Sequence, residues 1–302
     1  MPCVTLCSKP RHSLSWFNST LFLQNFGRFW PVWVLYGAVW LLLLPVGLFN
    51  GSAGDWALPS GGYDPNAYLI QSIPAGLFFS PLFGVLSAMA VFSYLFNPRA
   101  VGLMHTLPIR REGLFLTNYL SGLGFFLLPI LFVAAVTLAV QAYIGEGVAW
   151  TALFLWVWCQ AMMTLFFFSL ACLCAMLTGL LAALPVFFAA ANMLVLGLYS
   201  LLQQISACFL FGYDASDIPW LSWFLSLFFG YGSSMNVPPW VEWLTPLLCY
   251  CNHLGNTGAP DYRLTGLFPI FVYGFLGLVL AGLALLLYRR RQLEAAGDVV
   301  AV

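Results

Sequence analysis

The chain is 302 residues long, of which 62% are apolar and only 7% are charged. About 25% of the residues of a soluble globular domain are charged, so this composition excludes an ordinary soluble domain. Ten basic and ten acidic residues give a formal net charge of zero. This balance says nothing about partners, because the charges are segregated along the chain, and we expect no nucleic-acid partner for a membrane protein of this kind.

The first 28 residues form a lead-in of mixed polarity. They lack the short apolar core and the small-residue cleavage site of a secretory signal, so we expect the first spanning helix to direct insertion. Ser15, Asn18, Asn25 and Arg28 recur at helical spacing within one broad polar stripe. The opposite face is not cleanly apolar, so the amphipathic pattern is weak.

Six apolar runs follow that are long enough for membrane-spanning helices, each of which needs about 20 apolar residues to cross about 30 Å of hydrocarbon. The runs are 29–49, 73–96, 114–141, 150–177, 183–210 and 267–288. Their cores contain no Asp, Glu, Lys, Arg or His. The sequence therefore predicts an all-α membrane protein with a lead-in over 1–28, a six-helix domain over 29–288 and a basic tail over 289–302.

The connections between the runs differ in length and polarity. Residues 50–72 are polar and turn-rich, whereas the uncharged Thr178–Gly179 predicts a tight hairpin between the fourth and fifth helices. Segment 211–266 contains two apolar pieces, Trp220–Phe229 and Trp240–Cys251, which are expected to lie in the interface or to re-enter the membrane partway. An alternative has residues 220–251 crossing as a hairpin, for eight spans. The residues that disfavour it are Gly230, Gly232, Pro238, Pro239 and Glu242.

The basic residues set the orientation of these six runs. Nine of the ten fall on one side of the membrane, and Arg263 is the exception. Lys and Arg gather in cytoplasmic segments, so both termini are expected in the cytoplasm of a multi-pass plasma-membrane protein. Seven of the ten acidic residues fall on the opposite side.

A search for catalytic chemistry finds little. The spanning runs contain no paired Asp, no Ser–His pair and no metal-binding cluster, and His12, His105 and His253 fall on different sides of the membrane. The phosphate-binding pattern G-x-x-x-x-G-K-S/T is absent. Four of the eight cysteines, Cys159, Cys172, Cys174 and Cys208, lie in apolar runs, where cysteine behaves as a small hydrophobic residue. We therefore expect no catalytic residue, no metal, no cofactor and no enzyme activity in this chain.

The most informative segment is 97–112, after the second run. Asn97 followed by Pro98 resembles an N-cap with proline at the first helical position. The predicted helix ends near Thr106, because the residue before Pro108 avoids the helical region. The alternative is a charged turn that only anchors the topology.

The stretch Leu107-Pro-Ile-Arg-Arg-Glu-Gly-Leu-Phe-Leu116 resembles the Leu-Pro-x-x-Arg-x-Glu signature that opens the third helix of ABC-2-type transporter permeases. Glu112 follows Arg111 directly, without the intervening residue of the signature. The polar lead-in, the order of six helices, the long segment before the sixth helix and the ending Tyr288-Arg-Arg-Arg-Gln-Leu-Glu-Ala-Ala-Gly-Asp298 are also similar to that family.

The resemblance implies the permease subunit of an ATP-driven exporter, with ATP hydrolysis in a separate ATPase subunit. A second permease chain, identical or homologous, and membrane lipids are the other implied partners. Ser13–Gly27 would form an amphipathic surface helix and 211–266 would correspond to extracellular gate helices. The residues implied in coupling to the ATPase are Asn97, Arg99, Val101, Met104, His105, Pro108, Arg110, Arg111 and Glu112. The chain is then either a short permease or part of a longer one.

The substrate path is expected to involve the few polar residues of the fifth helix, Asn192, Gln203 and Gln204. Small residues allow close helix approach, either between two chains or within one. The candidates are Gly122, Gly124, Ala189 to Ala191 and Gly197.

Two other functions remain open on the sequence. A stand-alone ion-coupled carrier or channel would need intramembrane charge or broken helices, for which only Pro129 and Pro185 are hints. A membrane enzyme at the outer interface would draw on Asp214, Asp217, Glu242, His253 and Asp261, which have no recognisable ligand spacing.

Overall fold

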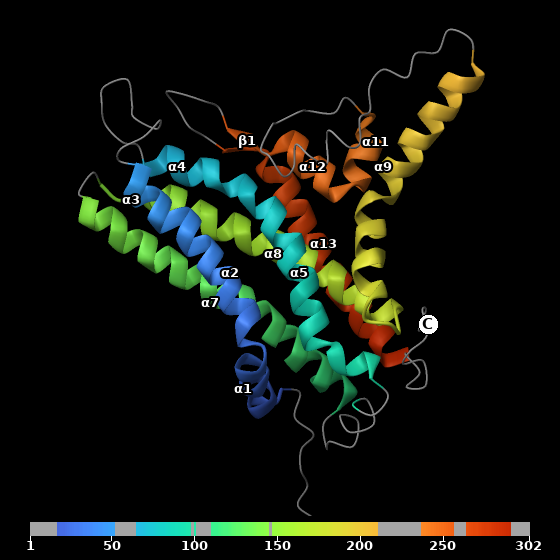
Figure 1. Cartoon of the computed structure of the whole chain (residues 1–302), viewed down its shortest axis with the longest axis horizontal. Helices are drawn as coiled ribbons and strands as arrows, with labels where there is room; N and C mark the ends of the chain where they lie inside the picture. Colours follow the sequence, from blue (N-terminus) through green and yellow to red (C-terminus); the bar gives the residue numbers. More distant parts are fainter. Residues whose placement is uncertain are drawn as a thin grey trace, which may run out of the picture.

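The computed structural model describes residues 17–51, 65–97, 100, 110–144, 147–210, 237–256 and 264–290, without the side chains of 50, 51, 255, 256 and 265. Six helical segments in this part are long and apolar enough to cross a membrane (Figure 1). They are Trp30–Phe49, Pro65–Val91, Arg111–Ile144, Trp150–Leu177, Ala183–Phe209 and Leu267–Arg290. The protein is therefore an all-α multi-pass membrane protein, as the hydropathy runs predicted.

The lead-in helix α1 (Ser19–Arg28) packs its polar stripe against another helix, which the sequence did not predict. Asn18 caps α1, because its Oδ1 accepts hydrogen bonds from the amides of Thr20 and Leu21 at 3.0 and 3.2 Å. Asn25 is buried and its Nδ2 donates to Oδ1 of Asn118 at 2.9 Å. Leu23 is exposed instead. Part of the polar face of α1 is thus buried against α7. Ser15, the first residue of the predicted stripe, lies outside the described residues.

The first span consists of α2 (Trp30–Leu41), a π-helical turn η1 (Leu42–Val46) and α3 (Gly47–Gly51). Pro31, at the start of α2, separates it from α1. Pro45 lies within the π-helical turn and is buried. Proline has no amide hydrogen and crowds the preceding turn, so a wider turn at this position is the expected local response.

The second span begins earlier than the sequence predicted. Helix α4 (Pro65–Ser72) occupies residues expected in a loop, and a 3₁₀ turn η2 (Ile73–Ala75) joins it to α5 (Gly76–Val91) and then η3 (Ser93–Phe96). Pro74 lies in this turn. The break leaves the Ile73 carbonyl to accept a hydrogen bond from Nε2 of Gln160 at 3.1 Å. A buried side chain therefore satisfies the irregular backbone, as a membrane interior requires.

The third and fourth spans are α7 (Arg111–Ile144) and α8 (Trp150–Leu177). The 34 residues of α7 correspond to about 51 Å, well beyond the hydrocarbon thickness. Pro129 lies inside α7 without interrupting it. At the turn into α8, Oε1 of Gln141 accepts a hydrogen bond from the Ala149 amide at 3.2 Å.

Helix α8 is the centre of the bundle, with 72% of its most apolar stretch buried. Glycines of α5 and α13 (Leu267–Arg290) allow both helices to approach it closely. A Cβ on Gly84 would lie 3.3 Å from the backbone of Phe167, and one on Gly277 would lie 2.9 Å from Cα of Phe166. Lipid supplies no hydrophobic driving force for helix association, so helices in a membrane are held by close packing, which small residues at their contacts allow.

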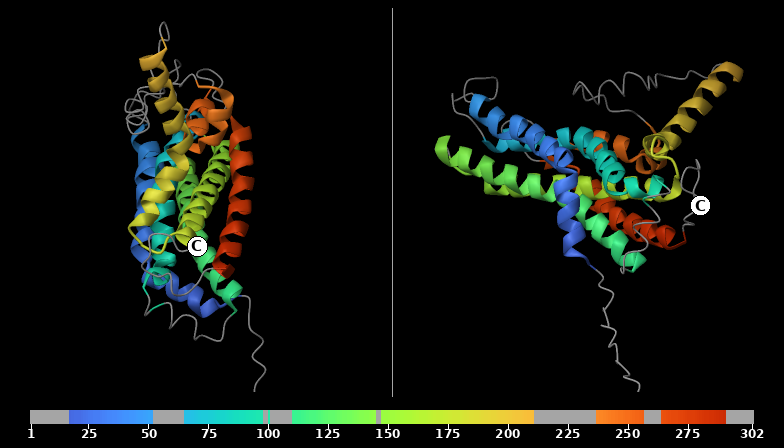
Figure 2. Two further views of the ribbon diagram at one scale, coloured as in Figure 1. Left: turned by 90° about the vertical axis from the view of Figure 1, so that its right-hand side faces the viewer. Right: turned by 60° about the horizontal axis from the view of Figure 1, so that its bottom comes forward.

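Helix α9 (Ala183–Phe209) is only 28% buried in its most apolar stretch and leans away from the bundle toward its end (Figures 1 and 2). It follows α8 after a short connection in which Oγ1 of Thr178 donates to the Cys174 carbonyl at 3.0 Å. Its buried residues Leu184, Phe188, Asn192, Leu196 and Ser200 recur every fourth position. One narrow face therefore contacts the bundle.

Two short helices, α11 (Pro239–Leu244) and α12 (Pro246–His253), precede α13. With 6 and 8 residues they are far too short to cross a membrane, so the alternative in which 220–251 spans is wrong for this part. Trp220–Phe229 lies outside the described residues. A two-residue antiparallel pairing joins β1 (Gly255–Asn256) to β2 (Leu264–Thr265).

The bundle has two distinct ends. We call the end with α1, the start of α7 and the end of α13 the arginine end, and the end with α4, α11 and α12 the loop end (Figure 1). Helix α1 runs obliquely across the arginine end (Figure 2).

Candidate functional site

At the arginine end, the start of α7 meets the end of α13. Arg110, Arg111, Glu112 and Arg289 line an open pocket of about 330 Å³. Among the described residues, three arginines and one glutamate thus line the same open space. We call this the arginine pocket.

An ion pair between Glu112 and Arg289 joins the two sides of the pocket. The side chains are 22% and 53% exposed, so solvent screening reduces the contribution of the pair to about 0.5 kcal/mol. Its main consequence is geometric, because it connects the first turn of α7 to the last turn of α13. Glu112 therefore has a partner within its own chain.

An aromatic layer lies beneath the pocket. The hydroxyls of Tyr94, in η3, and Tyr288, in α13, are 3.2 Å apart. The ring of Phe115 lies 5.5 Å from that of Tyr288, and Oη of Tyr119 lies 2.7 Å from Oγ of Ser169. Elements from the second, third, fourth and sixth spans meet here, so the bundle is tightly packed directly below the arginines.

Most of the predicted coupling residues lie outside the described part of the chain. These are Arg99, Val101, Met104, His105 and Pro108. Asn97 has the extended backbone that an N-cap requires, with φ −116° and ψ 114°. Arg110, Arg111 and Glu112 come together at the pocket. The sequence did not predict Arg289 as their neighbour. The signal was there, because the basic residues 289–291 follow the sixth span on the same side of the membrane as Glu112, where one of them can pair with its carboxylate.

The polar residues of α9 do not converge on one path. Asn192 is buried, and its Nδ2 donates to the Phe188 carbonyl of the same helix at 2.9 Å. Gln203 donates from Nε2 to Oη of Tyr199 at 2.6 Å, and Gln204 is exposed. Among the described residues, Oδ1 of Asn192 has no hydrogen-bond partner. The three side chains therefore lie in different environments and do not line one common path.

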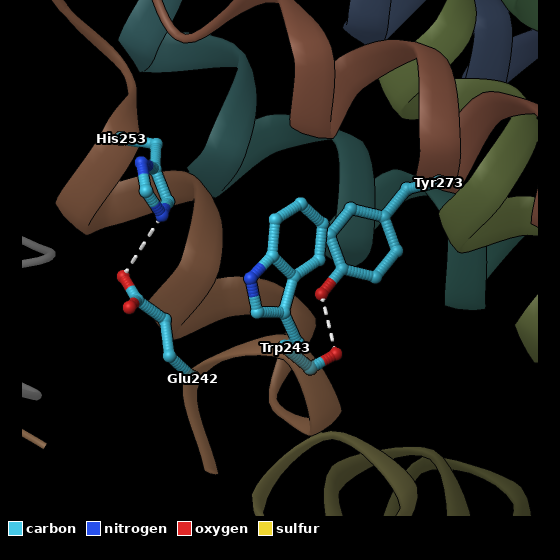
Figure 3. Close-up of polar contacts among 4 residues, drawn as sticks. All are labelled: Glu242, Trp243, His253 and Tyr273. Atoms are coloured by element: carbon cyan, nitrogen blue, oxygen red, sulfur yellow. Dashed lines mark hydrogen bonds and ion pairs between the residues drawn. The ribbon is translucent and has the colours of Figure 1, made fainter. Parts of the chain in front are cut away.

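At the loop end, two of the five predicted outer-interface residues, Glu242 and His253, lie next to each other. Nε2 of His253 lies 3.3 Å from Oε1 of Glu242, and Trp243 lies between His253 and Tyr273 (Figure 3). The Tyr273 hydroxyl donates to the Trp243 carbonyl at 2.8 Å. Asp214, Asp217 and Asp261 lie outside the described residues. This cluster fastens α11 to α12 and α13.

Two cysteines of α12 lie beside this cluster. Burial raises the pKa of the Cys249 thiol to about 11, with smaller effects from a hydrogen bond with Tyr273 and from the Glu242 carboxylate. Burial raises the pKa of Cys251 to about 12. Within the described ranges, no three His, Cys, Asp or Glu side chains are placed to hold a metal ion.

The small residues noted in the sequence divide into two groups. A Cβ on Gly122 would lie 2.2 Å from the ring of Phe168, and one on Gly124 would lie 2.6 Å from that of Phe26. These two glycines therefore pack helices within the chain. Gly197 has open space around it and Ala189 to Ala191 are exposed.

Comparison with known proteins adds no family. The chain matches no protein-family model and no curated protein. What is established is therefore an all-α multi-pass membrane protein that carries an arginine pocket at one end and a histidine–glutamate pair at the other.

Proposed function

We propose that this chain is the permease subunit of an ATP-driven ABC-2-type exporter, oriented with the arginine end in the cytoplasm. Segment 97–112 docks on a separate ATPase subunit. Six spanning helices, basic residues gathered at one end and the Leu107–Glu112 motif leading into α7 support this proposal.

The observation that carries it is the way α7 is joined to its neighbours. Its first turn is paired with α13 through Glu112 and Arg289, and two turns further along it is bonded to α1 through Asn118 and Asn25. A displacement of segment 97–112 therefore reaches α1, α7 and α13 as one unit. An ATPase dimer that closes on nucleotide would bind one conformation of the bundle more tightly than the other. Closure would therefore shift the bundle toward the conformation that the closed dimer prefers.

The substrate of this exporter is apolar or amphipathic, such as a lipid or a hydrophobic peptide. The described spanning helices contain no ionisable Asp, Glu, Lys, Arg or His between their ends, and such groups mark ion and proton pathways in membranes. Two chains form the path at their interface, for which the exposed small residues Ala189 to Ala191 and Gly197 of α9 are suited.

The test uses the complex reconstituted in proteoliposomes and compares ATP hydrolysis with substrate movement. Replacing Arg110 and Arg111 together with Glu should lower transport per ATP hydrolysed by tenfold or more, with normal insertion. Arg290→Glu is the control, because Arg290 is exposed at the same end but lies outside 97–112. Unchanged coupling in the double variant contradicts the docking role.

A further inference from the structure

Helix α11 links α9 to α12 and α13 at the loop end, although it has only 6 residues. On one side, the ring of Trp240 lies 5.9 Å from that of Tyr199 in α9. On the other side, the Trp243 carbonyl accepts a hydrogen bond from the Tyr273 hydroxyl of α13 at 2.8 Å. A helix of this length is not stable on its own. The position of α11 therefore depends on its contacts with these neighbours.

One contact of α11 carries a charge that depends on pH. Nε2 of His253, in α12, lies 3.3 Å from Oε1 of Glu242, in α11 (Figure 3). The side chain of Glu242 is 15% exposed and that of His253 is 42% exposed, so the imidazole can exchange protons with solvent. Histidine is the side chain that ordinarily gains or loses its charge between pH 5 and 8. The pair is ionic only while the imidazole is protonated.

Loss of this proton weakens the contact between α11 and α12. A protonated imidazole donates from both nitrogens, whereas the neutral ring keeps a proton on only one of them. Nε2 of the neutral ring either donates without the help of charge or presents its lone pair to the carboxylate. Charge-assisted hydrogen bonds are about twice as strong as neutral ones. The attraction is therefore present while His253 is protonated and decreases as the pH rises.

The other described ionisable groups that are influenced by the Glu242 carboxylate are Cys249 of α12 and Tyr273 of α13. Burial raises the pKa of the Cys249 thiol to about 11, and tyrosine hydroxyls ordinarily ionise near pH 10. The described residues of β1 and β2, which approach the His253 carbonyl at Gly266, have no ionisable side chain. Asp261 and Arg263, between the two strands, lie outside the described residues, so Asp261 is included in the test.

We propose that the Glu242–His253 pair is a pH-sensitive contact, which holds α11 against α12 in acid and weakens as the pH rises. Because α11 also contacts α9, protonation strengthens the attachment of α9 to the rest of the bundle at the loop end. The contact does not depend on the proposed transport function, since both residues belong to this chain. It can be tested on the full chain alone, without an ATPase.

The measurement is hydrogen exchange of the purified chain in detergent between pH 5.5 and pH 8.0, read by mass spectrometry. Protection factors, which correct for the pH dependence of the exchange chemistry, are compared for the amides of α11 and, as an internal reference, of α8. We expect the protection of α11 to be about threefold higher at pH 5.5 than at pH 8.0, the scale of a partly exposed ion pair. The protection of α8 should not change.

Three variants of the pair give different expected results. His253→Gln and Glu242→Gln should each remove the pH dependence of α11, because neither leaves an ionic pair. Glu242→Lys should reverse it, because two cations then repel each other in acid. A reversal cannot result from misfolding.

Asp261→Asn is the matched control, because it removes an acid from the same end of the chain and should retain the pH dependence. A wild-type chain whose α11 protection does not change with pH would overturn the proposal. A dependence that persists in His253→Gln would do the same, and so would one that is lost in Asp261→Asn.

Discussion

Asn25 in α1 donates a hydrogen bond from Nδ2 to Oδ1 of Asn118 in α7, and both side chains are buried. The same Nδ2 lies 3.3 Å from Oγ of Ser121, and the Asn18 amide donates to Oγ1 of Thr117 at 3.2 Å. Helix α1 is thus attached to the third span by a row of polar contacts.

The first prediction concerns this attachment. Asn25→Ala should lower the free energy of unfolding in detergent by about 1 kcal/mol, because it leaves Asn118 buried without its donor. A double-mutant cycle with Asn118→Ala should give a coupling energy of about 0.6 kcal/mol, the average for side-chain hydrogen bonds in membranes. Gln24→Ala, at the exposed neighbouring position, is the control. A coupling energy of zero would mean that the pair does not hold α1 in place.

Close packing between α13 and α8 gives the second prediction. Gly277→Ala should destabilise the protein by about 1–3 kcal/mol, because the new methyl group meets Cα of Phe166 and backbone must move. Gly282→Ala on the same helix enters open space and should be neutral or stabilising by up to about 1 kcal/mol. Equilibrium unfolding of the two variants provides the comparison. Equal effects would show that the α8–α13 contact is looser than described.

The third prediction concerns Asn192. Its amide oxygen is buried without a partner among the described residues, so Asn192→Leu removes an unsatisfied group and should leave stability unchanged or raise it by up to about 1 kcal/mol. Because Nδ2 of Asn192 donates to the Phe188 carbonyl of its own helix, transport should also persist. Thermal unfolding and a transport assay on the same preparation decide this. Loss of transport in a stable variant would instead assign the amide to the substrate path.

The fourth prediction concerns thiol reactivity near the loop end. With pKa values raised to about 11 and about 12, only a very small fraction of the Cys249 and Cys251 thiols is ionised at pH 7.5. Maleimide reacts with the thiolate, so labelling of both should be slow at pH 7.5 and should accelerate as the pH rises toward these values. Cys208 is exposed and should be modified first. Peptide mass spectrometry after timed labelling measures the order, and equal rates for the three cysteines would contradict the described burial.

Hydropathy predicted the six spans because the length of each apolar run can be counted directly from the sequence. It did not predict where helices break. The turns at Pro45 and Pro74 lie within or beside apolar runs, whereas Pro129 lies in an unbroken helix. Whether proline breaks a membrane helix depends on which neighbouring side chain satisfies the freed backbone, as Gln160 does for Ile73. That partner is distant in the sequence.

The candidate site was predictable only in part for the same reason. The charges of Arg110, Arg111 and Glu112 are visible as a motif, but their convergence with Arg289 depends on the start of α7 lying beside the end of α13. The polar stripe of the lead-in was also visible. Its burial against Asn118 was not, because composition alone does not distinguish a face turned to water from one turned to polar residues of another helix.

Purification of the tagged chain from its native membrane in mild detergent shows whether a P-loop ATPase docks on segment 97–112. We expect a stoichiometric ATPase in the eluate, and its loss when residues 98–109 are replaced by a Gly-Ser linker of equal length. Arg290→Gln should retain it. A folded chain that purifies without any ATPase, or an ATPase that persists with the linker variant, would mean that segment 97–112 is not an ATPase-docking element.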